Sequence, residues 1–111
     1  MQTIEWQDFE KVELRVGTIR SARPNEKAVK PAYVLEVDLG ELGLKTSSAQ
    51  LTAHYSAEDL VGRQVLCVCN FAPKRVAGVR SEVLVTGVYD ADGKVVLASF
   101  DKPQANGSRL A

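Results

Sequence analysis

One segment of the chain combines the residue types that recognise phosphate groups. No acidic residue lies between Arg63 and Ser81, and the cations of that stretch are Arg63, Lys74, Arg75 and Arg80. Pro73 would stiffen the loop and Gly78 would let it turn back, so the last three cations would project from a rigid rim that phosphates can reach. The pattern therefore predicts an anion-binding loop, and its alternative is an ordinary surface loop with solvated cations.

A run of hydroxyl side chains, Thr46-Ser47-Ser48, is the second candidate for binding. It lies on a segment expected to be the third strand, where it would add hydroxyl donors for a ligand. The alternative is an ordinary polar strand edge. Neither segment contains a group that performs covalent chemistry by itself.

The sequence shows no catalytic constellation. It has no phosphate-binding or dinucleotide-binding glycine motif and no nucleophile elbow, and its only histidine, His54, sits in a polar stretch typical of the surface. Cys67 and Cys69 are two residues apart on an apolar strand, a spacing awkward for a disulfide, so we expect reduced, buried thiols. The sequence therefore predicts a binding protein that is not an enzyme and uses no metal and no cofactor.

Composition sets further limits. The 111 residues hold 14 Lys and Arg against 14 Asp and Glu, with 45% hydrophobic residues, which fits one folded domain over residues 1–111. Zero net charge argues against a generally basic nucleic-acid binder. Residues 1–60 carry 7 basic and 10 acidic side chains while residues 61–111 carry 7 and 4, so the charge distribution still allows a local basic patch.

Neither a targeting segment nor a membrane span is expected. The longest apolar run, around residues 65–68, is far below the ~20 residues that cross a bilayer. The first six residues have neither a basic start nor an apolar core of the kind a signal peptide needs. We therefore expect a cytoplasmic protein without membrane insertion.

Short strands joined by turns dominate the pattern. Val12, Leu14 and Val16 alternate with charged residues, and the apolar parity changes after Gly17, which predicts a bulge or bend there. Further strands are expected over 32–39, 44–49, 64–71, 82–89 and 94–99, with a capped helix over 56–60 and a loop over 72–80. One helical turn is expected near residues 8–11, and the tail from Phe100 looks irregular.

This order predicts an all-β protein, a five-stranded OB-fold Greek-key barrel with a short helix between strands three and four. An N-terminal helical turn and a C-terminal extension complete it. The alternatives are an SH3-like barrel and a fragment of a sandwich. The OB-fold is favoured because the helix falls where that barrel places it.

Four sequence blocks resemble the CsaA family, the bacterial secretion-chaperone branch of the tRNA-binding OB-fold domains. They span residues 9–19, 30–33, 46–51 and 70–84, and the resemblance covers about residues 8–109. It implies a homodimer that binds tRNA or unfolded precursor proteins and takes part in protein export. Ser48-Ala49-Gln50 and Phe71-Ala72-Pro73-Lys74 depart from the pattern of the tRNA-binding branch, which favours the chaperone branch.

Site residues follow from the resemblance and from the cationic loop together. The expected tRNA or peptide surface comprises Lys30, Lys45, Ser47, Ser48, Asn70, Lys74, Arg75, Arg80 and Ser81. The expected dimer interface comprises Trp6, Phe9, Phe100, Pro103, Asn106 and Gly107. The aromatic members of this second set are surplus to a core that the strands already supply, and a symmetric partner commonly covers such surface.

Two functions from different classes remain open. The first is an export chaperone whose apolar pockets hold extended precursor segments, with the export machinery as a further candidate partner. The second is a free-standing tRNA-binding protein that contacts phosphates through the basic rim. Apolar burial is not screened by salt whereas phosphate contacts are, so the salt dependence of binding separates the two.

Overall fold

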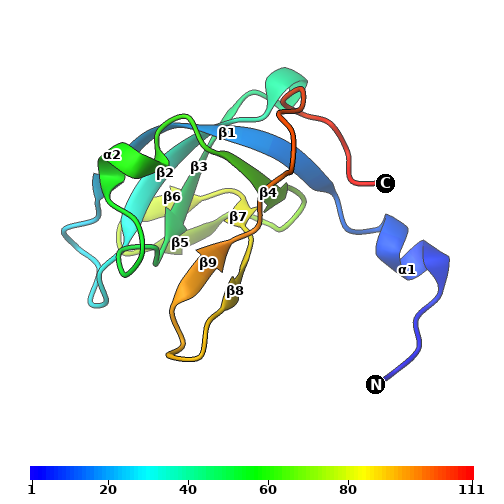
Figure 1. Ribbon diagram of the computed structural model, residues 1–111, viewed down its shortest axis with the longest axis horizontal. Coiled ribbons are helices and arrows are strands. Elements are labelled where there is room, and N and C mark those ends of the chain that lie inside the picture. Colours follow the sequence, from blue (N-terminus) through cyan, green and yellow to red (C-terminus); the bar gives the residue numbers. More distant parts are fainter.

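A computed structural model describes residues 1–111, and a five-stranded antiparallel sheet forms its centre. The sheet order is β3-β2-β1-β4-β7, built from β1 (Leu14–Pro24), β2 (Tyr33–Asp38), β3 (Leu44–Ala49), β4 (Gln64–Val68) and β7 (Leu84–Val85). The sheet curls so that its two edge strands come together. They are joined where the amide of Glu82, just before β7, donates to the carbonyl of Thr46 on β3 at 2.8 Å. The predicted OB-fold barrel is confirmed (Figure 1).

The long strand β1 serves both halves of the barrel. Leu14–Thr18 pairs with β4 and Thr18–Pro24 pairs with β2, with a register shift between Ile19 and Ser21. The predicted irregularity is therefore real but lies two residues beyond Gly17. Gly17 is needed for a different reason: a Cβ there would lie 2.5 Å from Val37 Cγ1 and 2.9 Å from Leu39 Cδ2. Close packing of two strands, rather than a bend, excludes a side chain at this position.

The helix α2 (Ala57–Leu60) lies between β3 and β4, as predicted. The Ser56 hydroxyl accepts the amide of Asp59 at 3.1 Å and so caps the helix, while Leu60 is fully buried. A short 3-10 helix, η1 (Gly40–Leu42), fills the turn between β2 and β3. The core is aliphatic, and its fully buried members include Ile19, Leu35, Val37, Leu39, Leu60, Val65 and Cys67.

The segment after β4 differs from the prediction in two ways. The expected loop over residues 72–80 is a hairpin of β5 (Lys74–Val76) and β6 (Val79–Ser81). Its central residues, Ala77 and Gly78, have φ of 47° and 81°, the two positive values that a tight type I′ hairpin requires. The sequence did not predict these two strands, because each strand has only three residues and the segment is rich in charged residues and follows a proline.

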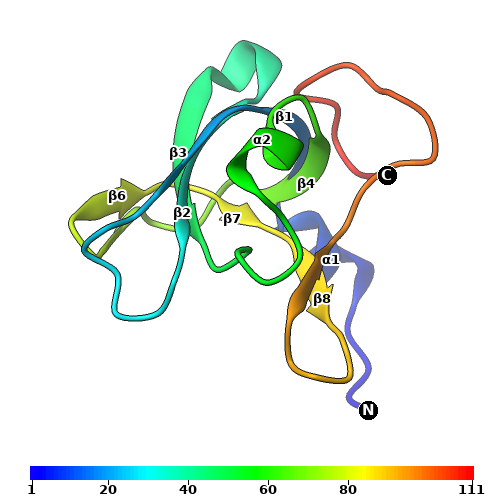
Figure 2. The same cartoon turned by 60° about the vertical axis from the view of Figure 1, so that its left-hand side comes forward.

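The expected single strand over residues 82–89 is divided. β7 pairs with β4, whereas β8 (Gly87–Tyr89) turns away to pair with β9 (Val95–Leu97) as the predicted hairpin. At the break, the Thr86 hydroxyl donates to the carbonyl of Leu66 at 2.8 Å. The division aims the β8–β9 hairpin out of the barrel (Figures 1 and 2).

The two ends of the chain lie outside the barrel. The helix α1 (Trp6–Glu10) forms an arm that stands away from it, with the rings of Trp6 and Phe9 5.3 Å apart (Figure 1). The C-terminal extension runs along β1, where the amide of Gly107 donates to Val16 and that of Leu110 to Leu14. No helix has the length and apolar character needed to cross a membrane.

Candidate nucleic-acid interface

The β5–β6 hairpin carries the predicted cations on exposed positions. Arg75 and Arg80 are direct cross-strand neighbours, and Lys74 precedes them on β5. Neither Lys74 nor Arg75 lies within 4.0 Å of a carboxylate, whereas Arg80 Nη1 lies 3.9 Å from Glu82 Oε2. Like charges directly opposite each other destabilise a sheet, and an anion bound between them removes the repulsion. The hairpin, which projects beside β2 and β3 (Figure 2), therefore presents two neighbouring cationic positions to solvent.

Glu82 anchors this hairpin to β3. Its Oε1 accepts the amide of Thr46 at 3.1 Å, and its Oε2 lies 3.9 Å from both Lys45 Nζ and Arg80 Nη1. This role was not predicted, although an acid directly after a run of cations was the available signal. Lys45, a predicted ligand residue, thus forms an ion pair with Glu82 when no ligand is bound.

The predicted hydroxyl residues have three different fates. Ser47 has only 1% of its surface exposed, so the prediction that it contacts a ligand is wrong: strand alternation points it into the core. Ser48 is half-buried and lines the groove described below. The Ser81 hydroxyl accepts the amide of Ser48 at 3.1 Å and so positions the hairpin.

Asn70 is exposed, but both ends of its amide are engaged within the chain. Its Nδ2 donates to the Lys11 carbonyl at 2.6 Å, and its Oδ1 accepts the amide of Glu13 at 3.0 Å. These bonds tie the base of the hairpin to the start of β1. Asn70 therefore positions the base of the hairpin, and its contact with a ligand stays a prediction.

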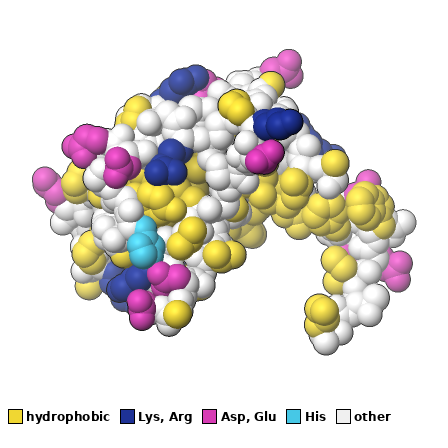
Figure 3. All heavy atoms as spheres, viewed as in Figure 1, with side chains coloured by type: hydrophobic (Ala, Val, Ile, Leu, Met, Phe, Trp, Pro, Cys, Tyr) yellow, Lys and Arg dark blue, Asp and Glu magenta, His cyan; other side chains and the backbone are white.

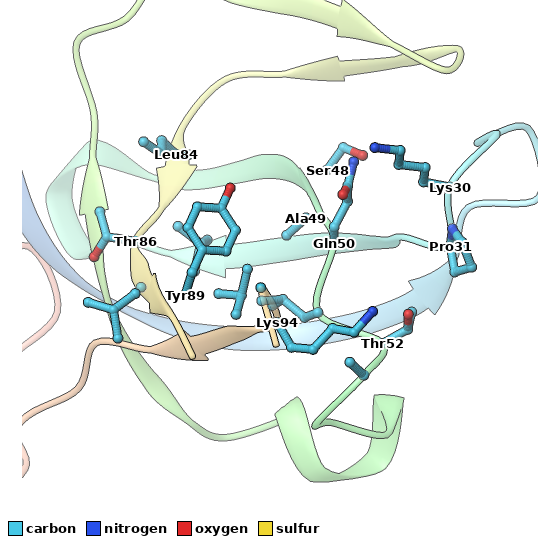
Figure 4. A pocket seen from close by; sticks show the side chains of 17 residues that line it. Lys30, Pro31, Ser48, Ala49, Gln50, Thr52, Leu84, Thr86, Tyr89 and Lys94 are labelled. Atoms are coloured by element: carbon cyan, nitrogen blue, oxygen red, sulfur yellow. The ribbon is translucent and has the colours of Figure 1, made fainter. Parts of the chain in front are cut away.

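A groove of about 820 Å³ opens between the end of β3 and the β8–β9 hairpin (Figure 4). Its lining comes from Lys30 and Pro31, Ser48–Ala53, Leu84–Tyr89 and Gly93–Val95. Lys30 and Ser48 belong to the predicted set, whereas Gln50, Tyr89 and Lys94 do not. The sequence did not predict that these three residues share a groove, because they are far apart in the chain. The division of the last strand is what brings β8 and β9 opposite β3.

His54 and Asp90 connect the two sides of this groove. His54 Nε2 lies 2.7 Å from Asp90 Oδ2. The amide of Lys94 and the His54 side chain lower the pKa of the Asp90 carboxyl by donating hydrogen bonds to it. The predicted surface position of His54 is confirmed, and the contact fixes the tip of the β8–β9 hairpin against the segment that follows β3.

A second hollow of about 310 Å³ lies beside the base of the β5–β6 hairpin. Five of its eight lining residues are hydrophobic, and the complete set is Leu39, Leu42, Lys45, Cys69, Phe71, Pro73, Glu82 and Val83. Phe71 and Leu42 are exposed. The hollow therefore joins apolar surface to the Lys45–Glu82 ion pair at its rim.

The two thiols show no reactive environment. Cys67 and Cys69 are free, as predicted, with Cys67 fully buried and Cys69 half-buried. Burial raises the pKa of the Cys67 thiol to about 12 and also raises that of Cys69. No group of three or more His, Cys, Asp or Glu residues lies close enough to hold a metal ion.

The predicted dimer residues occur at the two chain ends. Trp6 is 66% exposed, and the guanidinium of Arg109 joins the arm to the C-terminal extension by donating to the Glu10 carbonyl at 2.7 Å. Asn106 accepts the Thr18 hydroxyl at 2.7 Å and thus packs on its own barrel. The remaining members are Phe9, Phe100 and Gly107, which are half-buried, and Pro103, which is exposed. Hydrophobic side chains line the concave edge between barrel and arm (Figure 3).

Solved structures of full length resemble this chain closely. The chaperone CsaA from Bacillus anthracis is 45% identical with a TM-score of 0.93, and the match covers 99% of this chain and all of the other. The CsaA chaperone from Picrophilus torridus is 39% identical with a TM-score of 0.91, covering 98% of this chain and all of the other. The predicted resemblance to CsaA is thereby confirmed.

Curated relatives include much longer enzymes. Methionine--tRNA ligase from Leptospira biflexa is 41% identical over 101 residues, and that from Christiangramia forsetii is 37% identical over 97. These stretches cover 91% and 87% of this chain but only 14% of each ligase. The similarity thus falls within about one seventh of the enzymes' length. Residues 14–109 match the model of the family described as "Putative tRNA binding domain", and the chain belongs to this tRNA-binding domain family.

Proposed function

We propose that this chain binds tRNA and that the β5–β6 hairpin makes the principal phosphate contacts. The observation that carries the proposal is the exposed Arg75–Arg80 cross-strand pair, in which Arg75 has no carboxylate partner. A phosphate between the two guanidinium groups would accept hydrogen bonds from both. Membership of the tRNA-binding domain family supports the choice of ligand.

The salt dependence of binding tests this proposal. Fluorescence anisotropy of labelled bulk tRNA gives the affinity across a salt series. The double variant Lys74→Ala/Arg75→Ala should flatten the slope of log affinity against log salt by about 1.4 to 1.8, because two phosphate contacts are lost. The matched control Lys11→Ala/Lys102→Ala removes the same charge elsewhere and should leave the slope unchanged. Equal slopes for the two double variants would place the tRNA site away from the hairpin.

An export-related chaperone function is the second candidate. The apolar hollow around Phe71 favours it, because exposed aromatic and aliphatic surface next to charge suits an extended, unfolded segment. Full-length neighbours that carry the name CsaA chaperone support it as well. In this role the chain would act in the cytoplasm on precursor proteins before their export, together with the export machinery.

Competition separates the two candidates. An unfolded precursor peptide bound in the Phe71 hollow should keep its affinity as salt rises, and Phe71→Ser should weaken it. Val96→Ser, which alters an exposed apolar residue on β9, is the matched control. Peptide binding that is as salt-sensitive as tRNA binding would contradict an apolar site.

We also propose that two copies associate through the arm and the C-terminal extension. The Trp6 ring of α1 is exposed and no residue of α1 is buried, and a symmetric partner would remove this ring from water. Trp6→Asp should therefore give monomers in light scattering, while Val29→Asp, a change at an exposed loop valine, should not. A dimer that persists in Trp6→Asp would exclude this interface.

A further inference from the structure

The chemistry of the 820 Å³ groove differs from that of the hairpin. Its lining contains Lys30 and Lys94 but no Asp or Glu, in a chain whose total charge is zero. Eight of the lining residues are hydrophobic, and hydroxyl and amide side chains come from Ser48, Gln50, Thr52 and Thr86. A ligand suited to this surface has a flat, weakly polar body and carries negative charge.

Tyr89 forms one side of the groove. Its side chain is 77% exposed and makes no hydrogen bond or ring contact within the chain, although the β8–β9 pairing holds its backbone opposite Val95. The next residue, Asp90, is fixed by His54 and by the amides of Asp92 and Lys94. A free aromatic face on a fixed backbone is the arrangement on which proteins stack unpaired bases.

The opposite side supplies polar groups. Ser48 and Gln50 come from the end of β3, and Lys30 reaches the same region from the loop before β2 (Figure 4). Lys94 extends along the floor towards Thr52. The primary amide of Gln50 offers a donor and an acceptor side by side, which matches the edge of a nucleobase.

We propose that this groove holds an unpaired nucleotide of a bound RNA, with its base stacked on Tyr89. Gln50 then hydrogen-bonds the base edge, and Lys30 and Lys94 contact the flanking phosphates. Charge favours a nucleotide over an apolar peptide, because the phosphates of a nucleotide attract both ammonium groups and an apolar peptide offers them no opposite charge. The inference rests on RNA being the ligand of this chain and adds a base-binding site, separate from the hairpin, to the proposed phosphate contacts.

Two short probes isolate the stacking contribution. A labelled hexauridylate carries bases, and an abasic hexamer with the same phosphates does not. Wild-type protein should bind the hexauridylate roughly 5- to 150-fold more tightly, the range expected for stacking one base. Tyr89→Ala should remove this difference, whereas Tyr89→Phe should keep it because the ring remains. Val96→Ala, on the same hairpin but outside the groove, is the matched control.

The outcomes distinguish this site from the tRNA proposal. One outcome is that tRNA binding depends on the β5–β6 hairpin while Tyr89→Ala leaves the affinity for hexauridylate unchanged. This outcome would overturn the base site alone. Tyr89-dependent hexamer binding without hairpin-dependent tRNA binding would support the base site and overturn the hairpin proposal. Equal affinity of the wild-type protein for the two hexamers would exclude a nucleotide from the groove. Binding of a peptide that depends on Tyr89, with no binding of RNA that depends on Tyr89, would exclude it as well.

Discussion

At the scale of single residues, Gly17 shows how tightly this small barrel is packed. The side chains of Val37 and Leu39 occupy the space above it, so that even a methyl group would have to displace them. Both neighbours are fully buried and tightly surrounded, and a packed core yields little. The position therefore depends on the absence of a side chain rather than on unusual backbone angles.

Gly17→Ala should lower the free energy of unfolding by about 1 to 3 kcal/mol, because a methyl group is forced into a filled space. Urea unfolding followed by circular dichroism measures the change. The double variant Gly17→Ala/Val37→Ala should be more stable than the sum of the single effects predicts, since the smaller residue makes room. Simple additivity would show that Val37 is not the obstructing group.

The buried thiol of Cys67 gives a prediction about pH. Its pKa of about 12 in the folded chain lies above that of an exposed thiol, so folding favours the protonated form. Its contribution to stability is therefore complete below about pH 8.5, the unfolded pKa, and is lost progressively as pH rises towards 12. Cys67→Ala should unfold with a weaker dependence on pH between 9 and 11. An identical pH dependence would contradict the shift.

At the scale of elements, the β5–β6 hairpin would trade stability for the phosphate binding proposed above. Three-residue strands give few ladder bonds, and two arginines are direct cross-strand partners on them. The Arg75 guanidinium donates to the Gly78 carbonyl of the same hairpin at 3.2 Å. A hairpin selected only for stability would place opposite charges there. A phosphate bound there, as proposed above, would supply the missing negative charge.

Arg75→Glu should move stability and binding in opposite directions. A carboxylate directly opposite Arg80 would stabilise the hairpin by about 0.2 to 1 kcal/mol, while tRNA affinity should fall because a contact becomes repulsive. Thermal unfolding and anisotropy, measured on the same sample, report the two effects. Lys102→Glu changes the net charge equally and should have little effect on either. A loss of stability in Arg75→Glu would contradict the repulsion.

At the scale of the whole molecule, the barrel is a unit to which two end segments are attached. Its closure depends on the sheet and on the contacts of Glu82 with β3, whereas α1 contributes no buried residue. The C-terminal extension, by contrast, hydrogen-bonds along β1 at Val16 and Leu14. The two ends therefore differ in what they give to stability.

Removal of residues 1–8 should leave a cooperatively folded barrel, because no core residue is lost. Its unfolding midpoint should resemble that of the wild-type chain measured under conditions where the latter is monomeric. Removal of residues 104–111 is the comparison, and it should destabilise the barrel by taking away the bonds to β1. Equal effects of the two truncations would show that the arm also supports the barrel.

Local pattern was sufficient for the barrel and for the turn between β8 and β9, but insufficient for the β5–β6 hairpin. Alternating residues such as Tyr33, Leu35 and Val37 fix which face of a strand is buried, and the helix at 57–60 carries its own cap. The hairpin at 74–81 escaped prediction because its strands show neither alternation nor length. The role of Ser47 was wrong because strand parity, not residue type, decides whether a hydroxyl is exposed.

The sequence by itself determined the barrel, the cationic segment and the family, since these depend on residue types and on contacts between near neighbours. Only the tertiary structure decided that Arg75 faces Arg80, that Glu82 links the hairpin to β3, and that Tyr89 stands across a groove from Gln50. The physical reason is that these contacts depend on register and on where a strand breaks. Both are set by the packing of the whole core rather than by any one segment.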